Sequence, residues 1–172
     1  MKKNISEINQ TIKLFKVFNP PNLEKKISEV LKSGYLSEGD QVKKFSKKLS
    51  KFLKNRNIVC FNSCTSALTV AYNLAGIKKN CEVISTPSTC VAANIPLLHL
   101  GAKIIWADTN LETGMIDLND IKKKLTKKTK AVIVLHKDGV PFEIDKLRKI
   151  IIKKKIKNKN YRGCCPCLWS NL

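Results

Sequence analysis

Short apolar runs alternate with amphipathic stretches between residues 58 and 154, and this alternation constrains the fold more than any other feature of the sequence. The runs are rich in Val and Ile and have the length of β-strands. The predicted strands are residues 81–86, 103–108 and 130–136. The helices predicted among them are residues 90–100, 117–125 and 143–154. Continuous apolar strands that alternate with helices indicate a parallel α/β sheet with helices on both faces, which binds ligands at the carboxyl ends of its strands.

Residues 59–68 predict a strand that turns directly into a helix. Residues 58–61 are apolar, and Asn62, Ser63, Thr65 and Ser66 then supply polar groups where a helix would begin. A helix N-terminus has unpaired backbone N–H groups and a partial positive charge, so it can bind a phosphate. The same residues can equally form an N-capped helix without a ligand, and the bare sequence leaves both interpretations open.

Two amphipathic helices are predicted before this stretch, at residues 22–33 and 41–55. On composition and motifs we expect three parts. They are an N-terminal segment with a helix (1–33), a partial large domain (34–159) and an aberrant tail (160–172).

The chain of 172 residues carries a formal net charge of +20, from 33 lysines and arginines against 13 acidic residues. Only three of the basic residues are arginines, and no aromatic residues are interleaved with them. This pattern indicates a solvated lysine-rich surface and makes nucleic-acid binding unlikely. The first residues are polar and no apolar run reaches the roughly 18 residues of a membrane span. We therefore expect a cytoplasmic protein with reduced cysteines and no membrane partner.

Seven segments follow one another in an order typical of one enzyme family. They are Gly34–Gly39, Asn62-Ser-Cys-Thr-Ser-Ala-Leu68, residues 79–87, Thr89-Cys-Val-Ala-Ala-Asn94, Gly101–Asp108, residues 116–121 and residues 128–136. Together they resemble the DegT–DnrJ–StrS family of pyridoxal-phosphate-dependent sugar aminotransferases. The resemblance implies a fold-type-I transferase-like large domain, α/β and mainly parallel, which is incomplete in this chain.

The resemblance also implies a cofactor, pyridoxal 5'-phosphate, and the residues that would bind it. The phosphate would lie on the amides of Cys64, Thr65 and Ser66, and the ring would stack near Cys90. Two of these positions depart from the family pattern. Cys64 replaces a glycine, so its Cβ reduces the room for a phosphate, and Cys90 replaces an aromatic residue.

The implied activity is transfer of an amino group, usually from glutamate, to a keto-sugar nucleotide in surface-polysaccharide or amino-sugar biosynthesis. A complete protein would be a homodimer. The family's Schiff-base lysine lies in a later motif that this sequence does not contain, so no catalytic residue is assigned and we expect this chain alone to be inactive. The alternatives are an inactive binding or interaction protein and, less favoured, a nucleic-acid binder.

The tail at residues 160–172 has an unusual composition. Cys164, Cys165 and Cys167 form too short a ligand set for a convincing metal site, so no metal is predicted. Read one nucleotide later, the same stretch can spell the Ile-Glu-Asp-Ala-Ala-His motif of the family, so we expect a frameshift. His136 and Asp108, each at a strand end, could contact a ligand, but structural roles are favoured.

Overall fold

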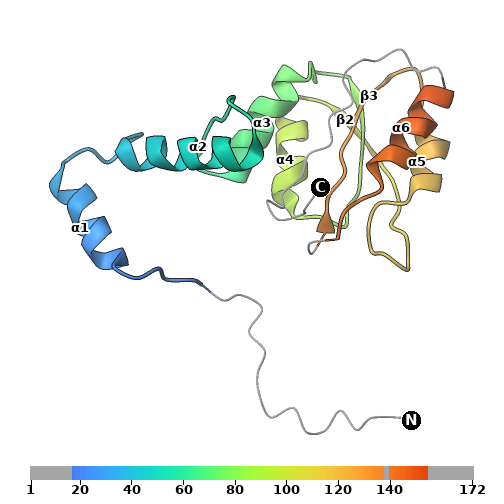
Figure 1. The fold of residues 1–172 in the computed structure, drawn as a ribbon. Helices are drawn as coiled ribbons and strands as arrows, with labels where there is room; N and C mark the ends of the chain where they lie inside the picture. The colour runs from blue at the N-terminus through green and yellow to red at the C-terminus, as the bar shows by residue number, and fades with distance from the viewer. Residues whose placement is uncertain (1–16, 138–139, 155–172) are drawn as a thin grey trace, which may run out of the picture. The chain divides into compact units, whose positions relative to one another are not determined.

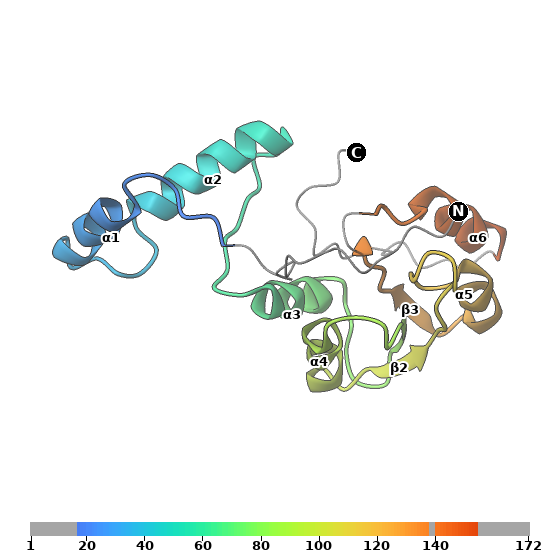
Figure 2. The same cartoon turned by 90° about the horizontal axis from the view of Figure 1, so that it is seen from below.

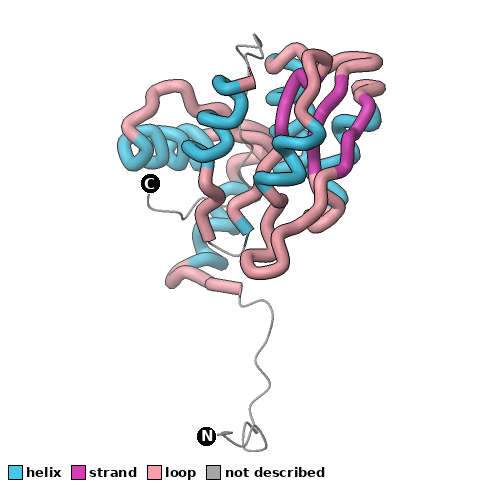
Figure 3. The backbone as a smooth tube through the Cα atoms, turned by 90° about the vertical axis from the view of Figure 1, so that its right-hand side faces the viewer, coloured by secondary structure: helices cyan, strands magenta, loops and turns pink. Residues whose placement is uncertain are grey.

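A sheet of three parallel strands forms the centre of the structure, in the order β2-β1-β3. The strands are β1 (Glu82–Ser85), β2 (Lys103–Trp106) and β3 (Thr129–Val132). β1 pairs with β2 in continuous register from Glu82↔Lys103 to Ser85↔Trp106, and with β3 through Val83↔Ala131 (Figure 3). This computed structural model describes residues 17–137 and 140–154.

Helices cover both faces of the sheet, as predicted (Figures 1 and 2). One pair is α3 (Cys64–Leu74) and α4 (Val91–His99), and the other is α5 (Leu118–Lys124) and α6 (Ile144–Lys153). Each pair packs on its own apolar core: Leu68 and Leu97 belong to one core, and Ile121 and Leu147 belong to the other. The predicted α/β class with a parallel sheet is therefore confirmed.

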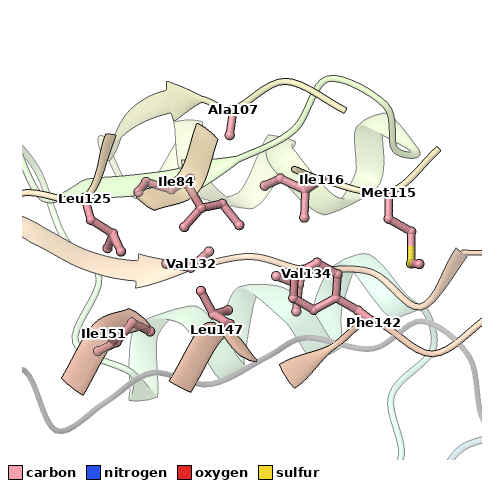
Figure 4. Packing of buried hydrophobic residues seen from close by; sticks show 11 residues of the cluster. Ile84, Ala107, Met115, Ile116, Leu125, Val132, Val134, Phe142, Leu147 and Ile151 are labelled. Atoms are coloured by element: carbon pink, nitrogen blue, oxygen red, sulfur yellow. The ribbon is translucent and has the colours of Figure 1, made fainter. Parts of the chain in front are cut away.

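Strand β3 and the residues after it supply both cores because successive side chains of a strand point to opposite faces. Ala131 and Ile133 lie in the core beneath α3 and α4, whereas Val132 and Val134 lie in the core beneath α5 and α6. Figure 4 shows the second core, where Val132 and Val134 lie opposite Leu147 and Phe142. The side chains of Ala131, Val132, Ile133 and Val134 are all at most 3% exposed.

Two further helices precede the sheet, α1 (Leu23–Lys32) and α2 (Asp40–Leu53). Both helices are amphipathic as predicted, but neither has a buried residue, and Leu31 and Phe45 are more than half exposed. The chain divides into two compact units between Val59 and Cys60, and α1 and α2 belong to the first. This division describes packing only, so the expected limits at residues 33/34 and 159/160 remain predictions.

The predicted strand at residues 58–61 is wrong, because this segment lies outside the sheet. A strand needs a partner for its backbone groups, and Val59 is instead 74% exposed. The strand predicted at 130–136 is also shorter than expected, since the ladder with β1 ends at Val132. Residues 160–172 lie outside the described residues, together with the proposed frameshift and the cysteine cluster. None of the described helices is both long enough and apolar enough to cross a membrane.

Candidate functional site

The first turn of α3 begins at a side-chain cap. Ser63 is the N-cap, with extended backbone angles, and its Oγ accepts a hydrogen bond from the Ser66 amide at 3.1 Å. The two hydroxyls lie 2.9 Å apart. The polar residues that predicted a helix start therefore do form one, and the cap uses the amide and the hydroxyl of Ser66.

Two amides and one hydroxyl of the same turn stay open. Within the described part of the chain, neither the Cys64 nor the Thr65 backbone N–H donates a hydrogen bond, and the Thr65 hydroxyl makes none. Cys64 is exposed and Thr65 is half-buried, so these donors can be reached from solvent. Open amides at the positive end of a helix dipole suit an anion such as a phosphate group. The donor set therefore fits the phosphate of the expected cofactor, although the Ser66 amide is already engaged.

Cys90 lies at the start of α4, as its N-cap residue, and its side chain caps no amide. A buried polar network fixes this helix start to the end of β1. Asn94 accepts a hydrogen bond from the Ser85 hydroxyl at 2.7 Å and donates one to the Thr86 carbonyl at 3.2 Å. The thiol of Cys90 is exposed, so it is free to contact a ring from outside the helix.

Topology brings both helix starts to the carboxyl side of the sheet. α4 begins directly after β1, and α3 runs in the opposite direction to β1 because its end leads by a short connection to the amino end of that strand. The Tyr72 hydroxyl donates to the Ala93 carbonyl at 3.0 Å and so joins the two helices. No hydrogen bond joins Cys90 to residues 64–66 among the contacts of the described residues.

His136 and Asp108, the other two candidates, have structural contacts. The Nδ1 of buried His136 accepts a hydrogen bond from the Phe142 amide at 2.7 Å, which ties the chain after β3 to the start of α6. The Asp108 carboxylate accepts a hydrogen bond from the Thr109 amide at 2.8 Å. Both contacts agree with the structural roles that were favoured.

Asp120 on α5 holds the end of β2 in place. Its carboxylate accepts hydrogen bonds from Lys124 Nζ at 2.6 Å and from the Asp108 amide at 2.8 Å. These two bonds lower the pKa of Asp120 below the usual 3.8, and the bond from Lys124 has the larger effect. Sequence reasoning did not single out this residue, because its partners come together only in the fold.

No group of three or more metal-ligating side chains occurs among the described residues. Their four cysteines, Cys60, Cys64, Cys81 and Cys90, are free thiols. The site therefore consists of helix-start donors, hydroxyls and thiols.

Known proteins are similar to this chain in both sequence and fold. The profile of the DegT/DnrJ/EryC1/StrS aminotransferase family matches residues 21–157. The spore coat polysaccharide biosynthesis protein SpsC of Bacillus subtilis is 35% identical over 69% of this chain and 31% of its own length. GDP-perosamine synthase of Vibrio cholerae is 31% identical over 75% of this chain and 35% of its own length.

The solved structure of the sugar aminotransferase CalS13 from Micromonospora echinospora superposes with a TM-score of 0.80 at 30% identity, over 90% of this chain and 42% of that one. The structure of AtS13 from Actinomadura melliaura gives the same TM-score and coverage at 34% identity. The chain spans about a third of the length of the curated relatives it matches.

Proposed function

Because the chain belongs to the DegT/DnrJ/EryC1/StrS aminotransferase family, we propose that it forms the part of a pyridoxal-phosphate-dependent aminotransferase that binds the cofactor phosphate. The observation that carries this proposal is the pair of open amides at Cys64 and Thr65, with the unpaired Thr65 hydroxyl beside them. Bound there, the cofactor supplies the electron-withdrawing ring on which amino transfer depends.

The residues of this chain would bind and orient the cofactor rather than catalyse amino transfer. The first turn of α3 would hold the phosphate through the Cys64 and Thr65 amides and the Thr65 hydroxyl. Cys90 would contact the ring, and this contact would be smaller and softer than that of an aromatic side chain. The buried Asn94 network keeps the start of α4 in position for that contact.

The names of the relatives support a proposal for the substrate class. One is named for GDP-perosamine synthesis, one for spore coat polysaccharide biosynthesis, and one as a sugar aminotransferase. We propose a keto-sugar nucleotide as acceptor and glutamate as amino donor. For the complete protein we propose a homodimer in the cytoplasm.

We propose that the 172 residues lack the lysine to which the family attaches the cofactor covalently. We therefore expect this chain by itself to bind the cofactor but not to catalyse amino transfer. Production of an amino sugar by the purified chain, from glutamate and a keto-sugar nucleotide, would contradict that expectation.

Binding of pyridoxine 5'-phosphate tests the proposed phosphate site. This analogue keeps the phosphate and the ring hydroxyl but has no aldehyde, so it cannot condense with the many surface lysines. We expect the chain to bind it in equilibrium dialysis and Thr65→Val to weaken binding by about fivefold, since one hydrogen bond to a charged phosphate is lost.

Thr69→Val is the matched control, because Thr69 lies one turn further along α3 and its hydroxyl bonds only the Thr65 carbonyl. Equal affinities of the wild-type chain and Thr65→Val would argue against this site. No binding by the wild-type chain would refute the proposal for this chain.

A further inference from the structure

Three loops converge at the carboxyl side of the sheet, one after each strand. Ser88 follows β1, Gly114 lies in the loop after β2, and Lys137 follows β3. The Lys137 Nζ donates to the Ser88 hydroxyl at 3.4 Å. The same Nζ lies 3.6 Å from the point where a Cβ on Gly114 would stand. The ammonium group is therefore at the meeting point of all three loops.

Among the described residues, this ammonium group has no charged partner. No carboxylate lies within 4.0 Å of it in the described part of the chain, whereas four other basic side chains there form ion pairs. Its hydrogen bond to Ser88 is longer than the usual 2.7–3.2 Å, so its hydrogen-bonding capacity is largely unused. An exposed cation with free donors at the ligand-binding edge of a parallel sheet suits an anionic oxygen.

The loop after β1 has a fixed shape and an unmet hydrogen bond. Its backbone is held by the Ser88 amide, which donates to Thr86 Oγ1 at 3.2 Å, and by the Thr89 amide, which donates to the Pro87 carbonyl at 2.8 Å. The buried Thr89 Oγ1 has no hydrogen-bond partner, and it is the only such buried side-chain atom among the described residues. Buried polar atoms are normally paired, so protein contacts alone do not satisfy this loop.

We propose that Lys137 and Ser88 form a second anion subsite, separate from the first turn of α3, which binds an anionic oxygen of the ligand held at this edge. The inference rests on the proposed function, because that function supplies the ligand. Two groups have this chemistry: the ring phenolate of the cofactor and a carboxylate of the amino donor. Ser88 precedes Cys90 by two residues, so the subsite adjoins the proposed ring position.

Binding of two probes to one charge-deleted variant tests the subsite. The probes are pyridoxine 5'-phosphate and L-glutamate, each measured with the wild-type chain and with Lys137→Met. We expect Lys137→Met to weaken binding of one probe by about tenfold, which is typical of removing a charge-assisted hydrogen bond. A weaker affinity for pyridoxine 5'-phosphate identifies the ring oxygen, and a weaker affinity for glutamate identifies the donor carboxylate.

Lys127→Met is the matched control, because Lys127 is also exposed but precedes β3 and so lies at the opposite edge of the sheet. Lys137→Arg keeps the charge and should retain most of the affinity. Lys137 is exposed, so we expect the variants to melt like the wild-type chain.

The outcomes separate the two proposals. Unchanged affinity of Lys137→Met for both probes, with Thr65→Val still weakening pyridoxine 5'-phosphate, overturns the subsite and leaves the phosphate site intact. An equal loss in Lys127→Met overturns the subsite as well, because it shows a general charge effect. A wild-type chain that binds neither probe overturns both proposals.

Discussion

Cys64 stands at the proposed phosphate site, where the resemblance to the family implies a glycine. It is the first residue of α3, and its amide is one of the two open donors at the proposed phosphate site. A glycine at this point would leave out the Cβ beside the amide, so a phosphate could approach more closely.

We therefore predict that Cys64→Gly binds pyridoxine 5'-phosphate about fivefold more tightly than the wild-type chain, which corresponds to about 1 kcal/mol of relieved crowding. Cys64→Ala keeps the Cβ and removes only the thiol, so its affinity should match that of the wild-type chain. Equilibrium dialysis of the three proteins decides the point. If alanine raises the affinity as much as glycine does, the thiol rather than the Cβ is the obstacle.

At the scale of single elements, Asp120 links α5 to the end of β2. Its pKa lies below the usual value in the folded chain, mainly because Lys124 donates to it and also because the Asp108 amide does. A carboxyl group with a lowered folded pKa stabilises the fold above its unfolded pKa, and this stabilisation is lost as the pH falls through the folded pKa.

We predict that Asp120→Asn lowers the free energy of unfolding by about 1.5–3 kcal/mol at pH 7, the range for a hydrogen bond to a charged group. The difference from the wild-type chain should shrink as the pH falls below about 4, where Asp120 of the unfolded chain takes up a proton, and should disappear once the folded carboxylate is protonated as well. Urea unfolding of both proteins at several pH values measures this difference in the free energy of unfolding. Asp145→Asn is the control, because its ion pair with Arg148 is exposed on both sides and should contribute little. An Asp120→Asn difference independent of pH would contradict the assigned role.

The sequence predicted the helices and strands whose formation depends on local features, such as an apolar run or a capping side chain. β1 and β2 follow from apolar runs, and α5 begins as predicted because Asp117 accepts hydrogen bonds from the Asn119 and Asp120 amides. The segment 58–61 was mispredicted because an apolar run does not show whether a neighbouring strand is available for pairing.

The same distinction applies to the site. Thr65 was identified because it belongs to a polar group of residues at a predicted helix start. Cys90 was identified only through the resemblance to the family. Lys137 was missed because it is one of many lysines, and only the fold places its ammonium group between Ser88 and Gly114. A charged residue directly after His136, at the end of a predicted strand, was the one available signal.

At the scale of the whole chain, burial is uneven. The helices α3, α4, α5 and α6 all contribute buried residues to the two cores, whereas α1 and α2 contribute none. Elements with few buried contacts open more readily and exchange their amide hydrogens faster.

We predict that amides in α1 and α2 exchange at least about tenfold faster than those in α3 and α6, after correction for intrinsic rates. Hydrogen exchange followed by mass spectrometry of the wild-type chain measures this ratio, and peptides from β1 serve as the slow reference. Slow exchange throughout α2, equal to that of β1, would show that its apolar face is covered in solution.

The alternating side chains of β3 and of the two residues after it also have a consequence for the order of folding. Ala131 and Ile133 complete one core while Val132 and Val134 complete the other, so neither core can close before this strand has paired with β1. During synthesis, β1 and β2 leave the ribosome before β3. Until β3 follows, the apolar residues on both faces of these two strands are incompletely buried. The two helical layers therefore gain their final packing in the same step, and the unit that contains the sheet should fold and unfold as one cooperative body.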